Sequence, residues 1–443
     1  MDKTTGKQPL AAQARALSKA GDWDKATLTL RQLISEVTGV ATLSLTINRD
    51  QYSLNSLNGT VELDDGRALF FKYHNEEGED KTIEEYYNAE LLRDSGFLVD
   101  VPLYACGEPG RQILLYQQRF DRRMADVCRN IELTQDWVAM LPVVEAQRRA
   151  DQEIWTATLP TLHESTLNQV SAEPIHQLFY HRLISEGLAP GFGGRVASFY
   201  VDQAFQLGEE RLSWQSLSNL RWVINGVPYA HSLRQLFAEA AARLSPTALS
   251  HHGTLTAHGD AHNANVWYET RGERPQLVSF DPAFAGRHIP ALLAEIKATF
   301  HNIFAHPLWL YEPARSAELY QVKVLRRGDT LYVDHNWQLT PLRAAFLDAK
   351  GKLYWQPLLD SLQRRGLLPA NWQRLFRLAM FCCPTLVLNL RVDGGSGHTP
   401  DSSALGFAMA MMLGSEPLDD ASDDFTDWLN GLTPAAAVPH EET

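Results

Sequence analysis

The stretch from His258 to Gly286 constrains this chain more than any other, because it gathers three side chains that can bind a metal or handle a proton. Asp260 stands in an HGD turn, Asn265 follows five residues later, and Asp281 comes sixteen residues after that, behind a short apolar run. This spacing predicts a loop that carries the first two side chains, followed by a hairpin that carries the third. Any fold proposed for the chain has to present them together.

Phosphoryl transfer requires such a set. One carboxylate orients the attacking hydroxyl, while an amide and a second carboxylate hold the magnesium ion that bridges the phosphates. The catalytic loop of protein kinases places its Asp and Asn at the separation seen here. Each residue alone has a structural alternative, since Asp260 could cap a turn and Asp281 before Pro282 could open a helix. The conjunction of the three favours chemistry.

A second interpretation takes His258 and His262 as zinc ligands at H-x3-H spacing, with Asp260 between them, as in metal-dependent hydrolases. A zinc pair at this spacing needs both histidines on one helical face. The surrounding HGDAHNAN is rich in residues that disfavour a helix, which argues against it.

The residues HGDAHNAN resemble the HGDxHxxN loop of the aminoglycoside phosphotransferase-like family, whose members phosphorylate small-molecule hydroxyls on a kinase-like fold. The resemblance implies that Asp260 is the catalytic base and that Asn265 and Asp281 bind Mg²⁺. It also implies an α+β, protein-kinase-like two-lobe fold with a small β-rich N-lobe and a large, mainly helical C-lobe. The chain departs from the family after Pro290, where no Asp opens the helix and Glu295 is the nearest carboxylate.

Residues 41–73 read as three short strands, ATLSLTI, TVEL and RALFFKY, separated by turn residues. Lys72 lies inside the apolar third run, where burying an ammonium is costly unless it meets an anion. The resemblance implies that Lys72 holds the α- and β-phosphates of the nucleotide. The alternative is an edge-strand lysine whose head reaches water.

The glycine-poor segment 53–59 (SLNSLNG) is expected to cover the phosphates, with Asn58 and Gly59 as nucleotide-binding residues; alternatively, Asn58-Gly59 is only a hairpin turn. A helix predicted over 81–94 offers the glutamate that pairs with Lys72. The resemblance favours Glu85, with Glu84 and Glu90 as the other candidates.

The run VPLYACGEPGRQILLYQQRF predicts two strands around a Glu-Pro-Gly turn, the second ending at Gln117. The resemblance implies that this second strand enters the hinge between the lobes. Backbone groups near Gln118 would then meet the adenine edge.

Residues 121–250 are predicted to be mainly helical and to include an insertion that shapes the acceptor site. Four aromatic residues there could line the site or belong to the core: Tyr180, Phe192, Phe199 and Tyr200. Residues 322–336 predict a β-hairpin around Gly328-Asp329, and 391–403 a loop that is either a lid or a plain connector.

Near the N-terminus, residues 9–36 predict two short helices that form a hairpin packed on the next part of the chain. The predicted domains are an N-terminal helical hairpin (1–40), an N-lobe (41–118), a C-lobe (119–430) and a disordered tail (431–443).

Composition limits the partners. With 40 basic against 53 acidic residues the formal charge is −13, so nucleic acid is not expected as a partner, whereas a cationic substrate would suit the surface. No apolar stretch is long enough to span a bilayer, and the N-terminus lacks the apolar core of a signal peptide. The four cysteines form no CxxC pair. These features predict a cytoplasmic protein without a membrane partner; the oligomeric state is left open.

Together these observations predict a Mg²⁺-assisted small-molecule kinase that uses ATP or GTP and phosphorylates a hydroxyl of an aminoglycoside-like compound, a sugar or an amino alcohol. A catalytically silent, kinase-like nucleotide-binding protein is the first alternative, motivated by the glycine-poor loop and the missing downstream Asp. The metal-dependent hydrolase is the second.

Overall fold

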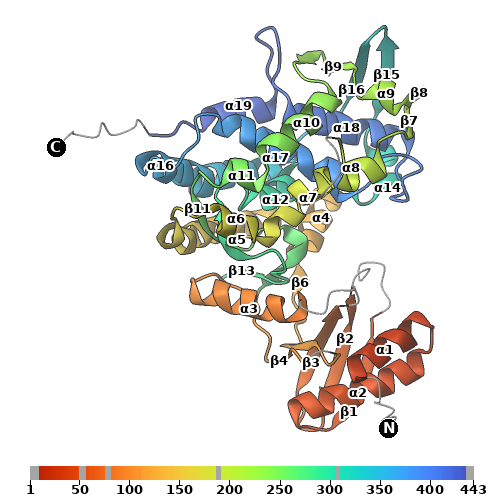
Figure 1. Cartoon of the computed structure of the whole chain (residues 1–443), viewed down its shortest axis with the longest axis vertical. Helices are drawn as coiled ribbons and strands as arrows, with labels where there is room; N and C mark the ends of the chain where they lie inside the picture. Colours follow the sequence, from red (N-terminus) through yellow and green to blue (C-terminus); the bar gives the residue numbers. More distant parts are fainter. Residues whose placement is uncertain are drawn as a thin grey trace, which may run out of the picture. The chain divides into compact units, whose positions relative to one another are not determined.

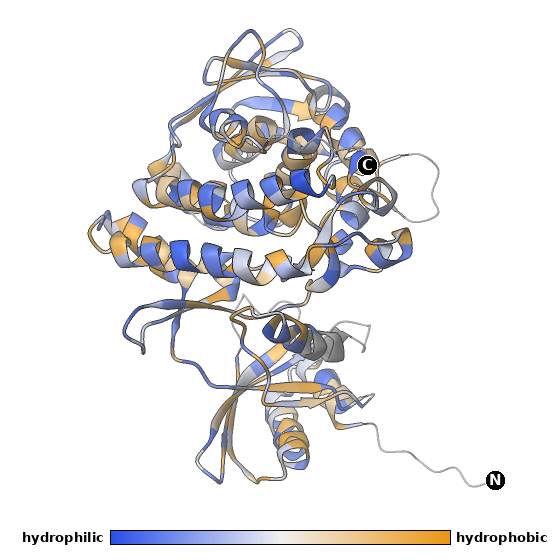
Figure 2. Cartoon of the chain, turned by 90° about the vertical axis from the view of Figure 1, so that its left-hand side faces the viewer, coloured by the Kyte–Doolittle hydropathy of each residue, from blue (hydrophilic) through white to orange (hydrophobic). Residues whose placement is uncertain are grey.

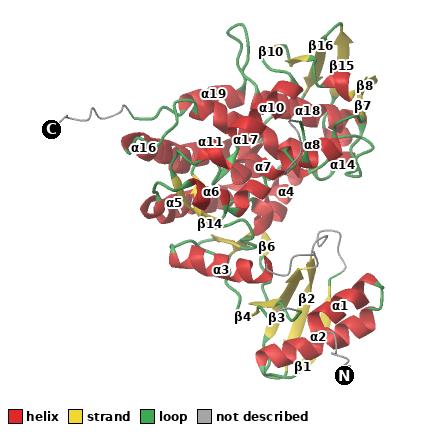
Figure 3. Cartoon of the chain, in the orientation of Figure 1, coloured by secondary structure: helices red, strands yellow, loops and turns green. Residues whose placement is uncertain are grey.

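The computed structural model describes residues 9–48, 56–74, 81–108, 110–185, 191–305 and 310–435, and it shows mixed α and β structure (Figure 3). The chain divides into two compact units, each described here by itself. The first unit is Met1–Arg122 with Val278–Ala283, and the second is Arg123–Leu277 with Phe284–Thr443. The four predicted domain limits stay predictions, and most of the predicted tail lies outside the described residues.

The first unit is built on a five-stranded sheet with the order β1-β2-β3-β5-β4, in which all neighbours are antiparallel. Leu69, Phe71 and Tyr73 of β3 are buried on one face. Because side chains alternate along a strand, Lys72 belongs to the opposite face. The strands are β1 (Thr42–Ile47), β2 (Ser56–Leu63), β3 (Ala68–His74), β4 (Tyr104–Cys106) and β5 (Ile113–Gln117).

Helices α1 (Leu10–Lys19) and α2 (Trp23–Thr38) cover that buried face of the sheet (Figure 1). They begin and end where the sequence provides signals: the Asp22 side chain caps α2 by accepting from the Lys25 N–H, and Gly39 ends it with a φ of 71°. Leu30 and Leu33 of α2 are fully buried against the sheet. Each such side chain stabilises the packing by about 1.5–3 kcal/mol.

Helix α3 runs from Lys81 to Asp94, the bounds that the sequence predicts. The segment 278–283 belongs to the same unit through polar contacts. The Ser279 N–H donates to the Leu98 carbonyl, the Asp100 N–H donates to the Ser279 carbonyl, and the Asn88 side chain donates to the Pro282 carbonyl. The chain returns from the second unit for this short stretch only, and it carries Asp281.

The second unit is mainly helical, and in Figure 2 several helices carry hydrophilic and hydrophobic residues along one ribbon, as expected for helices that bury one side. Its described α-helices are α4 (Met124–Thr134), α5 (Met140–Thr158), α6 (Leu167–Ser171), α7 (Tyr180–Leu183), α8 (Gly194–Phe199), α9 (Trp214–Leu217), α10 (Leu233–Arg243), α11 (Pro246–Leu249), α12 (Ile296–Thr299), α14 (Pro313–Leu319), α15 (Pro341–Lys350), α16 (Gln356–Arg364), α17 (Trp372–Val387), α18 (Pro400–Gly414) and α19 (Asp424–Gly431). Short 3-10 turns are η1 (Leu159–Thr161), η2 (Pro174–Gln177) and η3 (Asn263–Asn265), and π-helical turns are η4 (Phe300–Phe304) and η5 (Gly351–Trp355). Among the described helices, none combines the length and apolar character that crossing a membrane requires.

The remaining strands are short: β6 (Arg122–Arg123), β7 (Ala204–Leu207), β8 (Glu210–Ser213), β9 (Arg221–Ile224), β10 (Val227–Tyr229), β11 (Thr254–Ala257), β12 (Val266–Glu269), β13 (Gln276–Ser279), β14 (Gly286–Pro290), β15 (Val322–Arg327) and β16 (Thr330–His335). Strands β11 and β14 pair with each other, and so do β7 and β8.

Residues 121–250 are mainly helical, as predicted, but they also supply β9 and β10, which the sequence did not predict, to a four-stranded sheet with the order β10-β9-β16-β15. Strand β9 pairs in parallel with β16, about a hundred residues later in the chain, and the two lie side by side in Figure 1. The hairpin predicted at 322–336 is confirmed as β15 and β16. Pairing over that distance leaves no local pattern in the sequence of β9, which explains the miss.

Candidate active site

The HGD turn follows directly from strand β11, whose four residues are all buried. Gly259 has a φ of +77°, and a Cβ at this position would lie 2.7 Å from the Phe284 carbonyl oxygen. Only glycine meets both conditions without strain. The strand end and the glycine together place Asp260 at the start of the loop.

Hydrogen bonds within the loop fix Asp260 and Asn265 relative to each other. The Asn265 side-chain amide donates to the Asp260 carbonyl at 3.1 Å, and the His262 N–H donates to the same carbonyl at 2.8 Å. The Asn265 N–H in turn donates to the His262 carbonyl at 2.7 Å. Because this hydrogen bond uses the Asn265 nitrogen, the amide oxygen is turned to a different side.

The loop is anchored to the helical core by Asn263, which is buried. Its N–H donates to the Asn302 side-chain oxygen at 2.8 Å, and its own amide contacts the Cys128 sulfur at 3.7 Å. Breaking such a contact would leave a buried polar group unsatisfied, so the contacts of Asn263 help to hold the loop in place.

The Asp260 carboxylate serves no structural hydrogen bond through its Oδ1 atom. This atom is buried, and among the described residues it has no hydrogen-bond partner. The basic groups within 4 Å of it in the described residues are Lys297 Nζ at 3.9 Å and His262 Nε2 at 3.8 Å. The alternative in which Oδ1 caps a turn is therefore wrong, and an acceptor is left for a ligand hydroxyl.

In the first unit, Lys72 and Asp281 form an ion pair with 2.6 Å between Nζ and Oδ1. Lys72 sits on β3, a central strand, and its side chain is 12% exposed, so the edge-strand alternative is wrong. Asp281 has a φ of +58° and opens no helix, which overturns its helix-start alternative. Aspartate is one of the few non-glycine residues that adopt this conformation readily.

The structure corrects the position predicted for Asn58 and Gly59. Both lie inside strand β2, with Asn58 opposite Lys72 and Gly59 opposite Phe71, rather than in a loop or a hairpin turn. A Cβ on Gly59 would lie 2.0 Å from the Thr46 carbonyl oxygen, so this glycine permits close strand approach. The connecting residues 49–55 lie outside the described residues, and nucleotide binding by Asn58 and Gly59 stays a prediction.

Two other predicted nucleotide contacts remain open. The Glu85 and Glu84 side chains lie outside the described residues, while Glu90 lies 3.6 Å from Arg93 on its own helix. The Gln118 N–H donates to the Ala68 carbonyl at 3.1 Å. A backbone contact of Gln118 with a base would therefore have to use its carbonyl oxygen.

Three residues that the sequence pattern did not single out lie in a chain of contacts leading from Asp260. Lys297 donates to His301 Nε2 at 2.9 Å, and His301 Nδ1 lies 2.8 Å from the Tyr311 hydroxyl. Burial, and then the Lys297 charge, hold the pKa of His301 well below its ordinary value, so the ring is neutral. A lysine inside the apolar run ALLAEIKATF is the same signal that drew attention to Lys72.

The zinc interpretation does not fit the local backbone. His258 and His262 lie in irregular chain, and their Nδ1 atoms accept the N–H groups of Asp260 and Ala264. No helical H-x3-H face is formed, because the chain turns at Gly259 and is helical only from Asn263, in a 3-10 turn.

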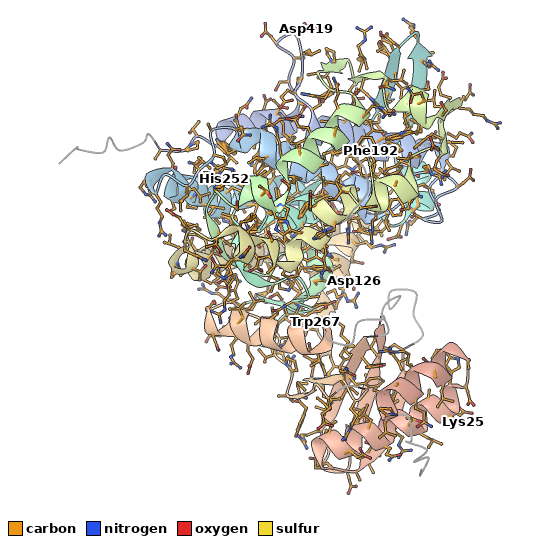
Figure 4. All side chains as sticks on the ribbon, viewed as in Figure 1. Lys25, Asp126, Phe192, His252, Trp267 and Asp419 are labelled. Atoms are coloured by element: carbon orange, nitrogen blue, oxygen red, sulfur yellow. The ribbon has the colours of Figure 1, made fainter. Side chains whose placement is uncertain are left out.

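The predicted aromatic lining belongs largely to the core. Tyr200 is fully buried, and its hydroxyl donates to the Thr385 carbonyl. Phe192, labelled in Figure 4, packs with ring centroids 6.0 Å from Trp214 and 6.1 Å from Phe237. These contacts support the core alternative for both residues.

Comparison with known proteins gives matches among solved structures only. No protein-family model matches the chain, and no curated protein does. An amicoumacin kinase matches with 12% identity and a TM-score of 0.41, over 86% of this chain and 92% of that one. A macrolide 2′-phosphotransferase type I matches with 12% identity and 0.39, over 87% and 97%. An ethanolamine kinase of Plasmodium vivax matches with 9% identity and 0.36, over 93% and 95%. At these scores the matches establish no common function, which has to rest on the residues of the site.

Proposed function

We propose that the chain is a Mg²⁺-dependent kinase that transfers the γ-phosphate of ATP or GTP to a hydroxyl of a small molecule, on a protein-kinase-like two-lobe fold. The observation that carries this proposal is the Asp260–Asn265 loop. Its structural hydrogen bonds use the Asp260 carbonyl, and the buried Asp260 Oδ1 atom accepts no hydrogen bond from the described residues. A carboxylate in that state is suited to accept a hydrogen bond from the hydroxyl that attacks phosphorus.

The ligands expected for magnesium fit that ion. Mg²⁺ prefers oxygen atoms of carboxylates and amides. Asn265 offers its amide oxygen because its nitrogen is engaged, and Asp281 offers a carboxylate that the structure pairs only with Lys72 among the described residues. When bound, the ion would neutralise charge on the phosphates. Asn265 and Asp281 would hold it.

Lys72 would exchange partners when the nucleotide binds. Its ammonium would pass from the Asp281 carboxylate to the α- and β-phosphate oxygens, which frees Asp281 to bind the metal. Catalysis would then consist mainly of positioning the hydroxyl at Asp260 and balancing the phosphate charge.

Thermal unfolding with ATP, GTP or ADP, each with and without Mg²⁺, tests this proposal. We expect stabilisation that needs both nucleotide and metal, of about 2.7 kcal/mol at a hundredfold excess over Kd. The Asp281→Asn variant should lose most of it, because a metal ligand and the partner of Lys72 are both changed.

Asp329→Asn is the matched control, since Asp329 is exposed and pairs only with Arg221 and Thr330 among the described residues. Its nucleotide response should equal that of the wild type. Absence of any nucleotide-dependent shift in the wild type would overturn the proposal. A shift without phosphoryl transfer to any alcohol would point to the silent nucleotide-binding alternative.

A further inference from the structure

Three basic side chains of the second unit form a cluster beside Asp260, with Lys297 nearest to its carboxylate. Lys297 is buried on α12, with Nζ 3.9 Å from Asp260 Oδ1. Arg182 on α7 donates to the Leu386 carbonyl at 3.2 Å, and Arg195 on α8 donates to the same carbonyl at 2.7 Å. Both guanidinium groups are therefore held by the C-terminal end of α17.

Carboxylates do not balance this cluster. In the described part of the chain, neither Arg182 nor Arg195 forms an ion pair, and Asp260 is the carboxylate nearest to Lys297. Among the described residues, three basic side chains thus share one nearby carboxylate, in a chain whose formal charge is −13. A buried cation is costly unless it meets an anion.

The charges of the cluster act on one another. Burial lowers the pKa of Arg182 to about 10, and the Asp260 charge opposes that fall while Arg195 adds to it. Burial also lowers the pKa of Lys297, again opposed by Asp260. Arg182 remains charged at neutral pH, and the Asp260 charge acts on both Arg182 and Lys297.

The ammonium group of Lys297 is also held in one orientation by hydrogen bonding. Its ammonium donates to the neutral His301 ring, which Tyr311 supports from the other side. A lysine fixed in this way does not swing out to solvent. Its remaining N–H groups are available to a ligand that enters beside Asp260, because the hydrogen bond to His301 uses only one of three donors.

Building on the proposed function, we propose that the acceptor is an alcohol that carries an anionic group, a carboxylate or a phosphate, and that Lys297, Arg182 and Arg195 bind this group while Asp260 receives the hydroxyl. A cationic acceptor, which the net charge alone would suit, meets the wrong local charge. The cluster lies on the unit that carries the base, whereas Lys72 and Asp281 belong to the other unit.

Binding of radiolabelled inorganic phosphate by equilibrium dialysis tests this assignment, in the presence of AMP-PNP and Mg²⁺ so that the nucleotide's own phosphates are supplied. Glycerate and ethanolamine serve as competitors of opposite charge. We expect phosphate to bind in the presence of AMP-PNP and to be displaced by glycerate but not by ethanolamine. Lys297→Met and Arg195→Gln should each weaken phosphate binding at least about tenfold, since each removes a charge-assisted hydrogen bond.

The variants and controls separate the possible outcomes. Lys297→Met keeps the side-chain length but removes a buried charge, whereas Arg195→Gln changes a half-buried residue. If one of the two variants folds poorly, the other still tests the inference. Lys352→Met, at a side chain that is 70% exposed, should bind phosphate like the wild type. If phosphate binds only without AMP-PNP, the cluster binds the transferred phosphate, and the inference is overturned. Displacement of phosphate by ethanolamine would also overturn it. So would phosphate binding that is unchanged in both variants. Failure of the proposed kinase function shows separately, as the absence of an AMP-PNP·Mg²⁺ thermal shift in the wild type.

Discussion

At the scale of single residues, the main chain and the side chain of Asp260 have different roles. Its carbonyl oxygen accepts two hydrogen bonds, from His262 and Asn265, and these shape the loop. Its carboxylate Oδ1 accepts none from the described residues. A change of the Asp260 side chain therefore leaves the hydrogen bonds of the loop in place.

Replacing Asp260 by Asn tests that separation. The amide has nearly the same shape but is a far weaker base, so phosphoryl transfer should fall by about 10²–10⁴-fold. The AMP-PNP·Mg²⁺ thermal shift should stay close to the wild type, because the loop hydrogen bonds use the backbone. The free energy of unfolding should fall, because buried Lys297 loses its nearest carboxylate. The measurement is kcat/KM with the first acceptor that the wild type phosphorylates. Wild-type turnover by the variant would show that another group accepts the proton.

At the scale of elements, the turn after β11 determines where the site residues lie. The strand is buried along its whole length, and Gly259 lets the chain turn beside the Phe284 carbonyl. In the first unit, strand β3 determines the position of Lys72. Alternate residues of β3 are buried on one face of the sheet, and Lys72 belongs to the opposite face. Both elements follow local rules of strand periodicity and glycine geometry.

The Gly259→Ala variant should therefore be destabilised. A positive φ costs alanine about 1–2 kcal/mol, and the 2.7 Å contact of the new Cβ with Phe284 adds to this. The urea midpoint of unfolding measures the change. Gly272→Ala is the matched control, because its φ is not positive and the nearest atom to its Cβ is 3.7 Å away. Equal midpoints for the two variants would show that the turn carries no special constraint.

At the scale of the whole molecule, a buried ion triad connects distant parts of the second unit. Lys350 Nζ on α15 lies 2.5 Å from Asp151 Oδ1 on α5 and 3.0 Å from Glu295 Oε2, just before α12. All three side chains are almost fully buried. Glu295, the carboxylate that comes after the site stretch in sequence, thus has a structural contact that its sequence neighbourhood does not reveal.

Lys350→Met should cost about 3–5 kcal/mol in unfolding free energy, because two buried carboxylates lose their counter-ion. Burial raises the pKa of Asp151, and Lys350 opposes that rise. In the variant the folded state therefore takes up protons at higher pH than the unfolded state, so its stability should recover as the pH falls toward 5. Denaturant unfolding at pH 7.5 and 5 measures both effects. The exposed Lys352→Met should show neither, and a pH-independent loss in Lys350→Met would argue for lost packing alone.

Much of the architecture could be predicted because its signals are local. Alternating apolar residues and turn glycines predicted the strands β1 and β3, the helix α3 with its bounds, and the hairpin of β15 and β16. The spacing of Asp260 and Asn265 is likewise local, and the structure places both in one hydrogen-bonded loop. Local patterns failed where a residue has two local interpretations, as at Asn58 and Gly59, which a turn and a strand both accommodate.

By itself, then, the sequence determined which side chains can do chemistry, because residue type and short-range spacing are properties of the chain. Only the tertiary structure decided what surrounds them. Lys72 meets Asp281 across 209 positions, and Lys297 comes to lie beside Asp260. Such neighbours depend on how distant segments pack against one another, and that packing is a sum over many apolar contacts with no signature at any single position. For this reason the candidate residues could be named from the sequence, whereas the charge around Asp260 could be seen only in the folded chain.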